Sequence, residues 1–489
     1  MTYGEPTGQD GRQKMLSAFI LNTLPATPAH VLLLGEQPVA PAAQLQNLGY
    51  RVTQCAYGAT LQSAQIATPT REPMGQVNLT FSEALTGAFD AALVLDLSPQ
   101  IHPLALWDQL GKWLAQESVV VLVGHEPTDK PARMPQWLDY LSAIGARCGF
   151  VAQDTVEDDP PTEPRSFLRV YRKAPAPRWQ LRHVRTGDFD AIATLFQEVF
   201  GHPISRELWA WKYANGHGNG VVAARQGSLV AHYGGMYRDI LLFGEPEWAF
   251  QICDVMVHPK ERGVMTRQGP FLLTAAIGAE IYGPLGFGFP HPRAMEVAQK
   301  MGLYAPVGRM VEVRWQAASA ARRWSTRLRV LARENAGDHT LVDGVWRQMA
   351  ADLVTEAVGL RDWAYLERRY LDHPHNHYEL IAVLSRWTGR PLGVLVLRRL
   401  DDGVELLDVV APLRVLPELI DQARRLATLW GKPTVFCWIT ANQVHHFMVQ
   451  DGVQTDVQVA IPTSVWTQDA RAHVFKDKWW LMSGDTDFR

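Results

Sequence analysis

The chain has 489 residues, which is more than one hydrophobic core ordinarily holds, so about two to four domains are expected. A hydrophobic fraction of 47% and a charged fraction of 20% are typical of a folded globular protein. A net charge of -3 gives no general attraction to nucleic acid or to anionic lipid. We therefore expect neither nucleic acid nor a membrane as a partner, and any anion-binding site must be local.

The N-terminal segment is polar, and no apolar stretch reaches the roughly 18 residues that a membrane-spanning helix needs. This pattern predicts a cytoplasmic protein. The four cysteines lie far apart in apolar stretches, at Cys55, Cys148, Cys253 and Cys437. Their spacing favours buried thiols over a disulfide or a zinc site. The adjacent His445 and His446 have no further ligand at metal spacing, so no metal is expected.

The first part of the chain, from residue 28 to 172, alternates short apolar runs with helical patterns. Strands are predicted at 30–35, 50–56, 90–97, 118–124, 145–156 and 165–173, and helices at 40–49 and 104–116. Strands that alternate with helices predict a mostly parallel sheet covered on both faces. The proline-rich segment "KAPAPRW", 173–179, marks the end of this domain.

The second part opens with a strand and then a helix whose N-cap is Thr186 or Asp188. Residues 220–259 alternate like an antiparallel meander, with turns at "RQGS" and "FGEPE". A helix, a short strand and another helix are predicted to follow, up to about residue 304. The order is strand, helix, antiparallel strands, helix, strand, helix.

A weak internal repeat lies beyond this part, because residues 206–236 can be placed beside 361–399 at an offset of about 155 residues. Both stretches have an aromatic cluster, a basic residue before tyrosine (Lys212-Tyr213 and Arg369-Tyr370) and a hairpin. The match continues from "FQICDVMVHP" to "VELLDVVAP", which aligns Asp254 with Asp408. Such a long period suggests two related domains rather than an array of repeats.

The stretch "HPKERGVMTRQGPFLLTAA", 258–276, leaves a strand and enters a helix through a basic, glycine-containing turn. A helix N-terminus presents unpaired amides and the positive end of the helix dipole to an anion. Gly263 and Gly269 would let the backbone approach a ligand closely, and Arg262 and Arg267 would bind phosphate oxygens. The alternative is a solvated turn without a ligand.

The turn and its surroundings resemble the GNAT superfamily of N-acetyltransferases, whose strand end "V-x-P-x-x-R-G" is matched by Val257, Pro259, Arg262 and Gly263. The resemblance covers 178–315, and 361–489 looks like the second half of tandem GNAT-like proteins. It implies acetyl-CoA, or another acyl-CoA, as the cofactor. The residues that it assigns to the coenzyme are Val257, Arg262, Gly263, Val264, Arg267 and Gly269. Met265 stands where the family has a second glycine.

Acyl transfer to an amine needs a base, an oxyanion donor and an acid for the leaving thiolate. The candidate bases are Asp254, Glu247 and His258, which lie on or beside one predicted strand. If Asp254 points inward, desolvation should raise its pKa; the alternative is a buried carboxylate paired with an arginine. Strand alternation places Cys253 on the opposite face from Asp254, in the core.

The acid is less clearly indicated, because Ala298 stands where many GNAT enzymes have a tyrosine. Tyr304 is the nearby candidate, with core or rim packing as the alternative. Trp209 and Tyr213 follow the first helix of the second part, where the resemblance implies an acceptor-binding wall, although core packing fits their helical spacing too. His291 is a third acceptor-binding candidate, and the alternative for it is a helix-capping turn.

The first domain resembles the class I S-adenosylmethionine-dependent methyltransferase fold, in "HVLLLGEQPVAPAAQLQNLGYRVTQC" and "FDAALVLDLSPQIHPLALWDQLGKWLAQESVVVLVG". Its first loop has only Gly35 where the family has several glycines, and "VTQCAYG" supplies no acid for the ribose hydroxyls. We therefore expect an inactive methyltransferase-like domain without S-adenosylmethionine, in which Asp96 is structural.

The fold class expected is α/β and α+β multidomain, with a Rossmann-like methyltransferase-type domain (1–173) followed by two GNAT-like mixed-sheet domains (178–315 and a degenerate 316–489). The expected function is acyl-CoA-dependent N-acyltransfer, with acetyl transfer to an amine of a small molecule. Three alternatives remain open: a non-catalytic binding or scaffold protein of a biosynthetic pathway, a bifunctional methyltransferase and acyltransferase, and acyl transfer to a carrier protein's thiol. The sequence indicates no oligomeric state.

Overall fold

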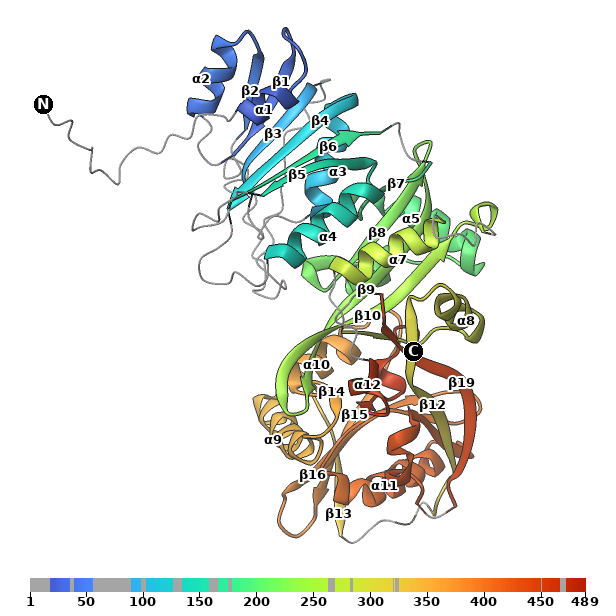
Figure 1. Ribbon diagram of the computed structural model, residues 1–489. Helices are drawn as coiled ribbons and strands as arrows, with labels where there is room; N and C mark the ends of the chain where they lie inside the picture. The colour runs from blue at the N-terminus through green and yellow to red at the C-terminus, as the bar shows by residue number, and fades with distance from the viewer. Residues whose placement is uncertain are drawn as a thin grey trace, which may run out of the picture. The chain divides into compact units, whose positions relative to one another are not determined.

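The computed structural model describes residues 18–35, 39–55, 89–97, 103–125, 134–157, 166–174, 178–262, 269–281, 285–319, 321, 325–449, 451–466 and 472–489. The chain divides into two compact units (Figure 1). The first comprises Met1–His183 with Ala223–Ser228, and the second comprises Val184–Val222 with Leu229–Arg489. Among the described residues, no helix has both the length and the apolar character needed to cross a bilayer.

The first unit contains a six-stranded sheet in the order β2-β1-β3-β4-β6-β5. Its strands are β1 (His30–Leu34), β2 (Arg51–Cys55), β3 (Phe89–Leu97), β4 (Leu114–His125), β5 (Phe150–Glu157) and β6 (Ser166–Lys173). The pairs β1–β2, β1–β3 and β3–β4 are parallel, whereas β6 is antiparallel to both of its neighbours. The predicted mostly parallel sheet is therefore confirmed.

The helices of this unit are α1 (Ala18–Thr23), α2 (Val39–Asn47), α3 (Pro103–Trp113) and α4 (Met134–Arg147). The strand order reverses beside β1, which has β2 on one side and β3 on the other. In open α/β sheets, ligands bind beyond the carboxyl ends of the strands at such a reversal. The loop residues 36–38 and 98–102, and the side chain of Asp96, lie outside the described part of the chain.

The second unit begins with two helices and a meander, whereas one helix before the meander was predicted. The helices are α5 (Phe189–Phe200), with Asp188 at its N-cap position but without a side-chain capping bond, and α6 (Arg206–Tyr213). The strands are β8 (Gly218–Arg225), β9 (Ser228–Leu242) and β10 (Glu245–Val257). The pairs Gln226-Gly227 and Phe243-Gly244 have positive φ at both positions, which is the conformation that tight two-residue hairpins require. Then follow α7 (Pro270–Ile281), β11 (Gly286–Gly288) and α8 (Pro292–Lys300).

A second sheet has the order β13-β15-β16-β17-β18-β12-β19. Its strands are β12 (Tyr304–Gln316), β13 (Thr326–Val330), β15 (Glu379–Ser385), β16 (Pro391–Arg399), β17 (Val404–Val410), β18 (Thr434–Thr440) and β19 (Val453–Ser464). The main helices are α9 (Ala336–Asp352), α10 (Trp363–Leu366) with the π-helical turn η6 (Glu367–Leu371), and α11 (Leu416–Leu429).

The two sheets of the second unit are built from interleaved segments of the chain. The first sheet runs β11-β10-β9-β14-β20, so β14 (Ala357–Gly359) and β20 (Trp479–Trp480) extend it from the C-terminal part of the sequence. Conversely, β12 leaves the first segment and pairs with β18 and β19 in the second sheet. In each sheet a strand that follows a helix pairs in parallel with the strand before that helix, β11 with β10 and β18 with β17. Each of the two sheets therefore contains strands from both the earlier and the C-terminal part of the second unit's sequence.

Candidate functional site

A bulge in β10 is the central feature of the sheet β11-β10-β9-β14-β20 in the second unit. Pairing between β10 and β9 runs continuously to Cys253 and resumes only at Met256, which faces His232. Asp254 adopts a left-handed conformation, with φ of 50°. On its other side β10 pairs with β11 only from Phe250 to Ile252. Neither ladder therefore assigns a partner to Asp254 or to Val255, and the two parallel strands part at this point.

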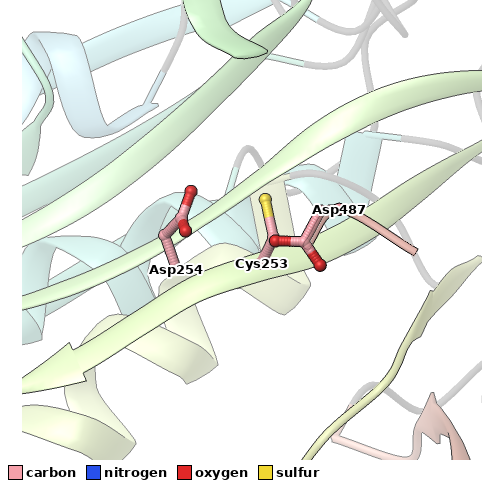
Figure 2. A group of neighbouring side chains, drawn as sticks. All are labelled: Cys253, Asp254 and Asp487. Carbon is pink, nitrogen blue, oxygen red and sulfur yellow. The ribbon is translucent and has the colours of Figure 1, made fainter. Parts of the chain in front are cut away.

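The bulge changes where the neighbouring side chains point. Strand alternation predicts Cys253 and Asp254 on opposite faces, and this prediction is wrong. The Cys253 sulfur and carboxylate oxygens of Asp254 and Asp487 lie within 4.8 Å of one another, and Figure 2 shows the Cys253 and Asp254 side chains directed to the same side of the strand. The left-handed residue interrupts the two-residue period, so the two side chains share one face.

Lys212, from α6, connects the carboxylates of this cluster. Its Nζ atom donates to both oxygens of Asp254 and to Oδ2 of Asp487, each at 2.9 Å. The Tyr213 hydroxyl donates to Asp254 Oδ2 at 2.7 Å and lies 3.4 Å from Cys253 Sγ. The Lys212 side chain is only 4% exposed and that of Asp254 is 6% exposed, so the ion pair is shielded from water.

The charges in this cluster oppose the predicted rise in the Asp254 pKa. Desolvation raises that pKa, but the Lys212 ammonium and the hydrogen bonds from Tyr213 and Lys212 outweigh it and hold the pKa below its ordinary value. The partner is a lysine rather than the arginine that the alternative named. The Lys212 ammonium lies among the Cys253, Asp254 and Asp487 groups and offsets one of the two carboxylate charges.

His232, on β9, fixes the backbone of the bulge. Its Nδ1 atom lies 2.6 Å from the carbonyl oxygen of Asp254; because a carbonyl only accepts, Nδ1 carries the hydrogen. Desolvation lowers the His232 pKa and keeps the ring neutral, and its Nε2 atom has no partner among the described residues. Gly220 and Gly234 leave room for the ring, since a Cβ on them would approach it to 2.7 and 2.4 Å.

The aromatic residues of α6 divide between two surroundings. Trp209 and Tyr213 stack on each other with ring centroids 4.0 Å apart, and Trp209 lies 5.6 Å from the His232 ring. Both therefore stand beside the bulge, partly buried. Trp211 faces the C-terminal segment instead, where its Nε1 donates to the Arg368 carbonyl at 2.9 Å.

Three of the predicted site residues lie elsewhere. Glu247 is exposed, seven residues from Asp254 along β10, which is roughly 23 Å of extended strand. His258 caps the turn after β10 by accepting from Lys260 N at 3.1 Å, and it pairs with Glu198 at 3.0 Å. His291 is exposed and caps α8 by accepting from Arg293 N at 3.3 Å, as the helix-capping alternative proposes. The structure brings none of the three into the Lys212–Asp254 cluster.

Tyr304 is buried and pairs with a second tyrosine. Its hydroxyl lies 2.6 Å from that of Tyr233 on β9. Burial raises the pKa of both phenols, so each stays protonated at neutral pH. Tyr233 packs closely on α7, because a Cβ on Gly278 would come within 2.4 Å of its ring. The two hydroxyls therefore lie beside α7.

Part of the predicted coenzyme turn is described. Val257 ends β10, and its carbonyl accepts from the exposed Arg262 Nε at 2.9 Å. Gly269 is buried, and its carbonyl accepts the first helical bond of α7 from Leu273 at 3.0 Å. Pro270 occupies the first helical position, where a missing N–H costs nothing. Gly263, Val264 and Arg267 lie outside the described residues.

The C-terminal segment repeats the tyrosine–aspartate pair of the bulge. The Tyr370 hydroxyl donates to Asp408 Oδ2 at 3.0 Å, as Tyr213 does to Asp254. Asp408 also lies beside a register shift between β16 and β17, and it is fully buried. Its cation is Arg361, whose Nε donates to Asp408 at 2.8 Å and whose Nη2 donates to Asp485 at 2.6 Å.

The most important partners in the cluster cannot be identified from local patterns. Lys212 enters the sequence comparison only as a repeated basic residue, and Asp487 lies 275 positions away from it. His232 has no motif around it. The sequence contains one signal for this cluster. Lys212-Tyr213 ends a short helix and is matched by Arg369-Tyr370 in the internal repeat, which indicates a polar contact that occurs twice.

The part of the chain that contains the bulge matches a known protein family. Residues 180–269 match the family described as the acetyltransferase (GNAT) domain. No curated protein matches the sequence. These ninety or so positions carry β8, β9, β10 and the bulge, so the part of the chain that matches this family includes the candidate site.

Several solved structures are similar in fold. One is a protein of unknown function from Enterococcus faecalis, described as a probable N-acyltransferase, at 11% identity over 61% of this chain and 74% of that chain, with a TM-score of 0.48. Another is a GCN5-related N-acetyltransferase from Kribbella flavida, at 16% identity over 58% and 71%, with a TM-score of 0.42. A third is N-myristoyltransferase from Saccharomyces cerevisiae with bound myristoyl-CoA, at 11% identity over 59% and 80%, with a TM-score of 0.41.

Proposed function

We propose that the protein is an acyl-CoA-dependent N-acyltransferase that transfers an acetyl or other acyl group to an amine. The single observation that carries this proposal is the orientation of one peptide group. In a trans peptide the carbonyl of Asp254 and the N–H of Val255 point in opposite directions. His232 Nδ1 binds that carbonyl at 2.6 Å, so the Val255 N–H points away from the His232 ring, and we infer that it faces the gap beyond the end of the β10–β11 pairing.

An amide directed into this gap is suited to hold a thioester carbonyl. Negative charge develops on that oxygen when the amine attacks, and a preorganised backbone donor stabilises it. The coenzyme's pyrophosphate would lie at the N-terminus of α7, where Gly269, the helix dipole and Arg262 favour an anion. Gly263, Val264 and Arg267 are retained as further coenzyme-binding residues from the sequence motif.

The leaving thiolate needs a proton, and we assign its donor to Tyr304. Its hydroxyl is protonated, buried and hydrogen-bonded to Tyr233 beside α7, on the side of the sheet proposed for the coenzyme. Asp254 is held ionised by Lys212 and is therefore a weak base; we give it the role of fixing the bulge. Trp209 and Tyr213 are proposed to form the acceptor wall next to it.

The repeated tyrosine–aspartate pair supports a second GNAT-like domain in the C-terminal segment, without the basic coenzyme turn. For the N-terminal unit we propose a methyltransferase-like domain without turnover. Its strand order reverses beside β1 as in dinucleotide-binding sheets. The loop after β1 has one glycine, which argues against S-adenosylmethionine as a cofactor.

Calorimetric titration of the full chain with acetyl-CoA, and separately with S-adenosylmethionine, tests the proposal. We expect acetyl-CoA to bind and S-adenosylmethionine not to bind. Binding of neither would exclude both enzymatic functions and leave the scaffold alternative. If both bind, the bifunctional alternative holds. After binding is established, release of free thiol from acetyl-CoA in the presence of pools of small amines measures acyl transfer.

A further inference from the structure

Arg368, in the turn η6, is a partly buried arginine that lacks an anionic partner. Its Nη2 atom donates to the carbonyl of Trp211 at 3.4 Å, near the limit of a hydrogen bond. A guanidinium has five N–H donors, so one long bond leaves most of them unused. None of the ion pairs in the described part of the chain includes Arg368.

The neighbouring arginines differ from Arg368 in this respect. Arg238 pairs with Asp485 at 2.9 Å, and Arg361 pairs with both Asp408 and Asp485. Arg369 pairs with no side-chain carboxylate, but its guanidinium donates to the main-chain oxygens of Gly484, Thr486 and Arg489 at 2.8 to 2.9 Å. Each of these cations thus has a carboxylate partner or several short hydrogen bonds, whereas Arg368 has one long hydrogen bond.

The surroundings of Arg368 favour an incoming anion. Burial and the nearby Arg238 charge lower the Arg368 pKa to about 10, because its charge is not compensated. Asp239, Asp372 and Tyr365 act in the opposite direction, but Asp372 is engaged by Arg333 at 2.6 Å. Burial and the Arg368 charge lower the pKa of His217 to about 4, so this neighbour is neutral at pH 7.

We propose that Arg368 binds a carboxylate of the acyl acceptor, so that the acceptor is an amine that also carries a carboxylate group. A planar carboxylate can accept two parallel hydrogen bonds from a guanidinium, which would satisfy the unused donors. The Trp211 Nε1 donates to the Arg368 carbonyl and so holds the Arg368 backbone. This proposal rests on the proposed acyltransferase function.

The position of Arg368 relates it to the bulge. Trp211, Lys212 and Tyr213 are consecutive in α6: the first contacts Arg368, and the other two hold Asp254. The proposed carboxylate site and the bulge are therefore connected through one short helix, α6.

Binding of simple probes tests the site without turnover. We expect benzoate to bind the full chain in an NMR or calorimetric titration and benzamide, its uncharged analogue, to bind at least about tenfold more weakly. Arg368→Gln should weaken benzoate binding by about 10- to 100-fold, the loss of a charged hydrogen bond. Arg390→Gln, at an exposed position of the β15–β16 turn, is the matched control and should leave benzoate binding unchanged.

Equal binding of benzoate and benzamide, no binding of benzoate, or unchanged binding in Arg368→Gln would each overturn the proposal. The thermal midpoint of Arg368→Gln separates a ligand site from a structural role: it should not fall, because an uncompensated charge has been removed, and a fall of several degrees contradicts the proposal. Titration with acetyl-CoA is independent of these results. Benzoate binding without acetyl-CoA binding would retain the anion site and reject the acyltransferase function; the reverse result would reject only the anion site.

Discussion

The Lys212 ammonium lies 2.9 Å from both carboxylate oxygens of Asp254. The same atom reaches Asp487 at 2.9 Å, so one buried cation joins a helix, a bulged strand and the C-terminal segment. The contact fixes the Asp254 side chain while His232 fixes the carbonyl of the same residue. The peptide group on which acyl transfer is proposed to depend is thereby held from two directions.

Replacing Lys212 by methionine should destabilise the protein strongly. The change leaves the Asp254 carboxylate buried without a cation, and breaking a buried pair in this way costs about 3 to 5 kcal/mol. The free energy of unfolding in urea measures the effect. Lys300→Met is the control, because its ion pair with Glu296 is on the surface and its loss should change little. Equal changes in the free energy of unfolding would show that the buried ion pair contributes no more to stability than the surface pair.

Replacing Arg262 by alanine should weaken acetyl-CoA binding by about 1 to 3 kcal/mol, the contribution of a charged hydrogen bond to phosphate. The dissociation constant from calorimetry is the measurement. Arg206, another exposed arginine, pairs with Asp190 at the surface and is not among the predicted coenzyme-binding residues, so Arg206→Ala is the control. If both variants bind acetyl-CoA like the wild type, the pyrophosphate is bound elsewhere.

Replacing Tyr304 by phenylalanine should lower the rate of thiol release by about 100-fold or more and leave acetyl-CoA affinity almost unchanged, because general acid catalysis acts on the transition state. Steady-state kinetics and calorimetry together separate the two quantities. Tyr50→Phe removes a hydroxyl bonded to the Pro25 carbonyl in the N-terminal unit and should leave the rate unaltered. A normal rate in Tyr304→Phe would assign the acid to another group.

Stability should fall as the pH falls from about 6.5 to 4. Burial lowers the pKa of His217 and His373 to about 4, whereas both titrate near 6.5 when unfolded. The unfolded state therefore binds more protons in this window, and protonation favours unfolding. His217→Asn should show a smaller fall in urea midpoint from pH 7 to 4.5. His202→Asn, a substitution at an exposed position, is the control and should show the same fall in urea midpoint as the wild type. If His217→Asn also shows the wild-type fall, burial does not lower the His217 pKa in the folded state.

Much of the local structure followed from pattern alone. Most strands of the first unit, the meander and the helix–strand–helix order after it lie close to their predicted ranges, but the strand predicted from residue 145 begins at Phe150, because α4 extends to Arg147. The glycines at 227 and 244 indicated both hairpin turns, since only a few residue types tolerate positive φ. The exchange of β12, β14 and β20 between the two sheets was not predicted, because short strands acquire their partners only through tertiary contacts.

The candidate site was predictable in position but not in detail. Sequence by itself placed a basic, glycine-containing turn between a strand and a helix, and located Asp254 on that strand, because hydrophobic periodicity and turn chemistry are local properties. Tertiary structure alone decided that the strand bulges at Asp254, that Cys253 joins it on the same face, and that Lys212 and Asp487 complete the cluster. The reason is physical: a bulge overrides the two-residue period, and the charge on the buried Asp254 depends on Lys212, 42 residues away, which in turn binds Asp487 at a separation of 275 residues.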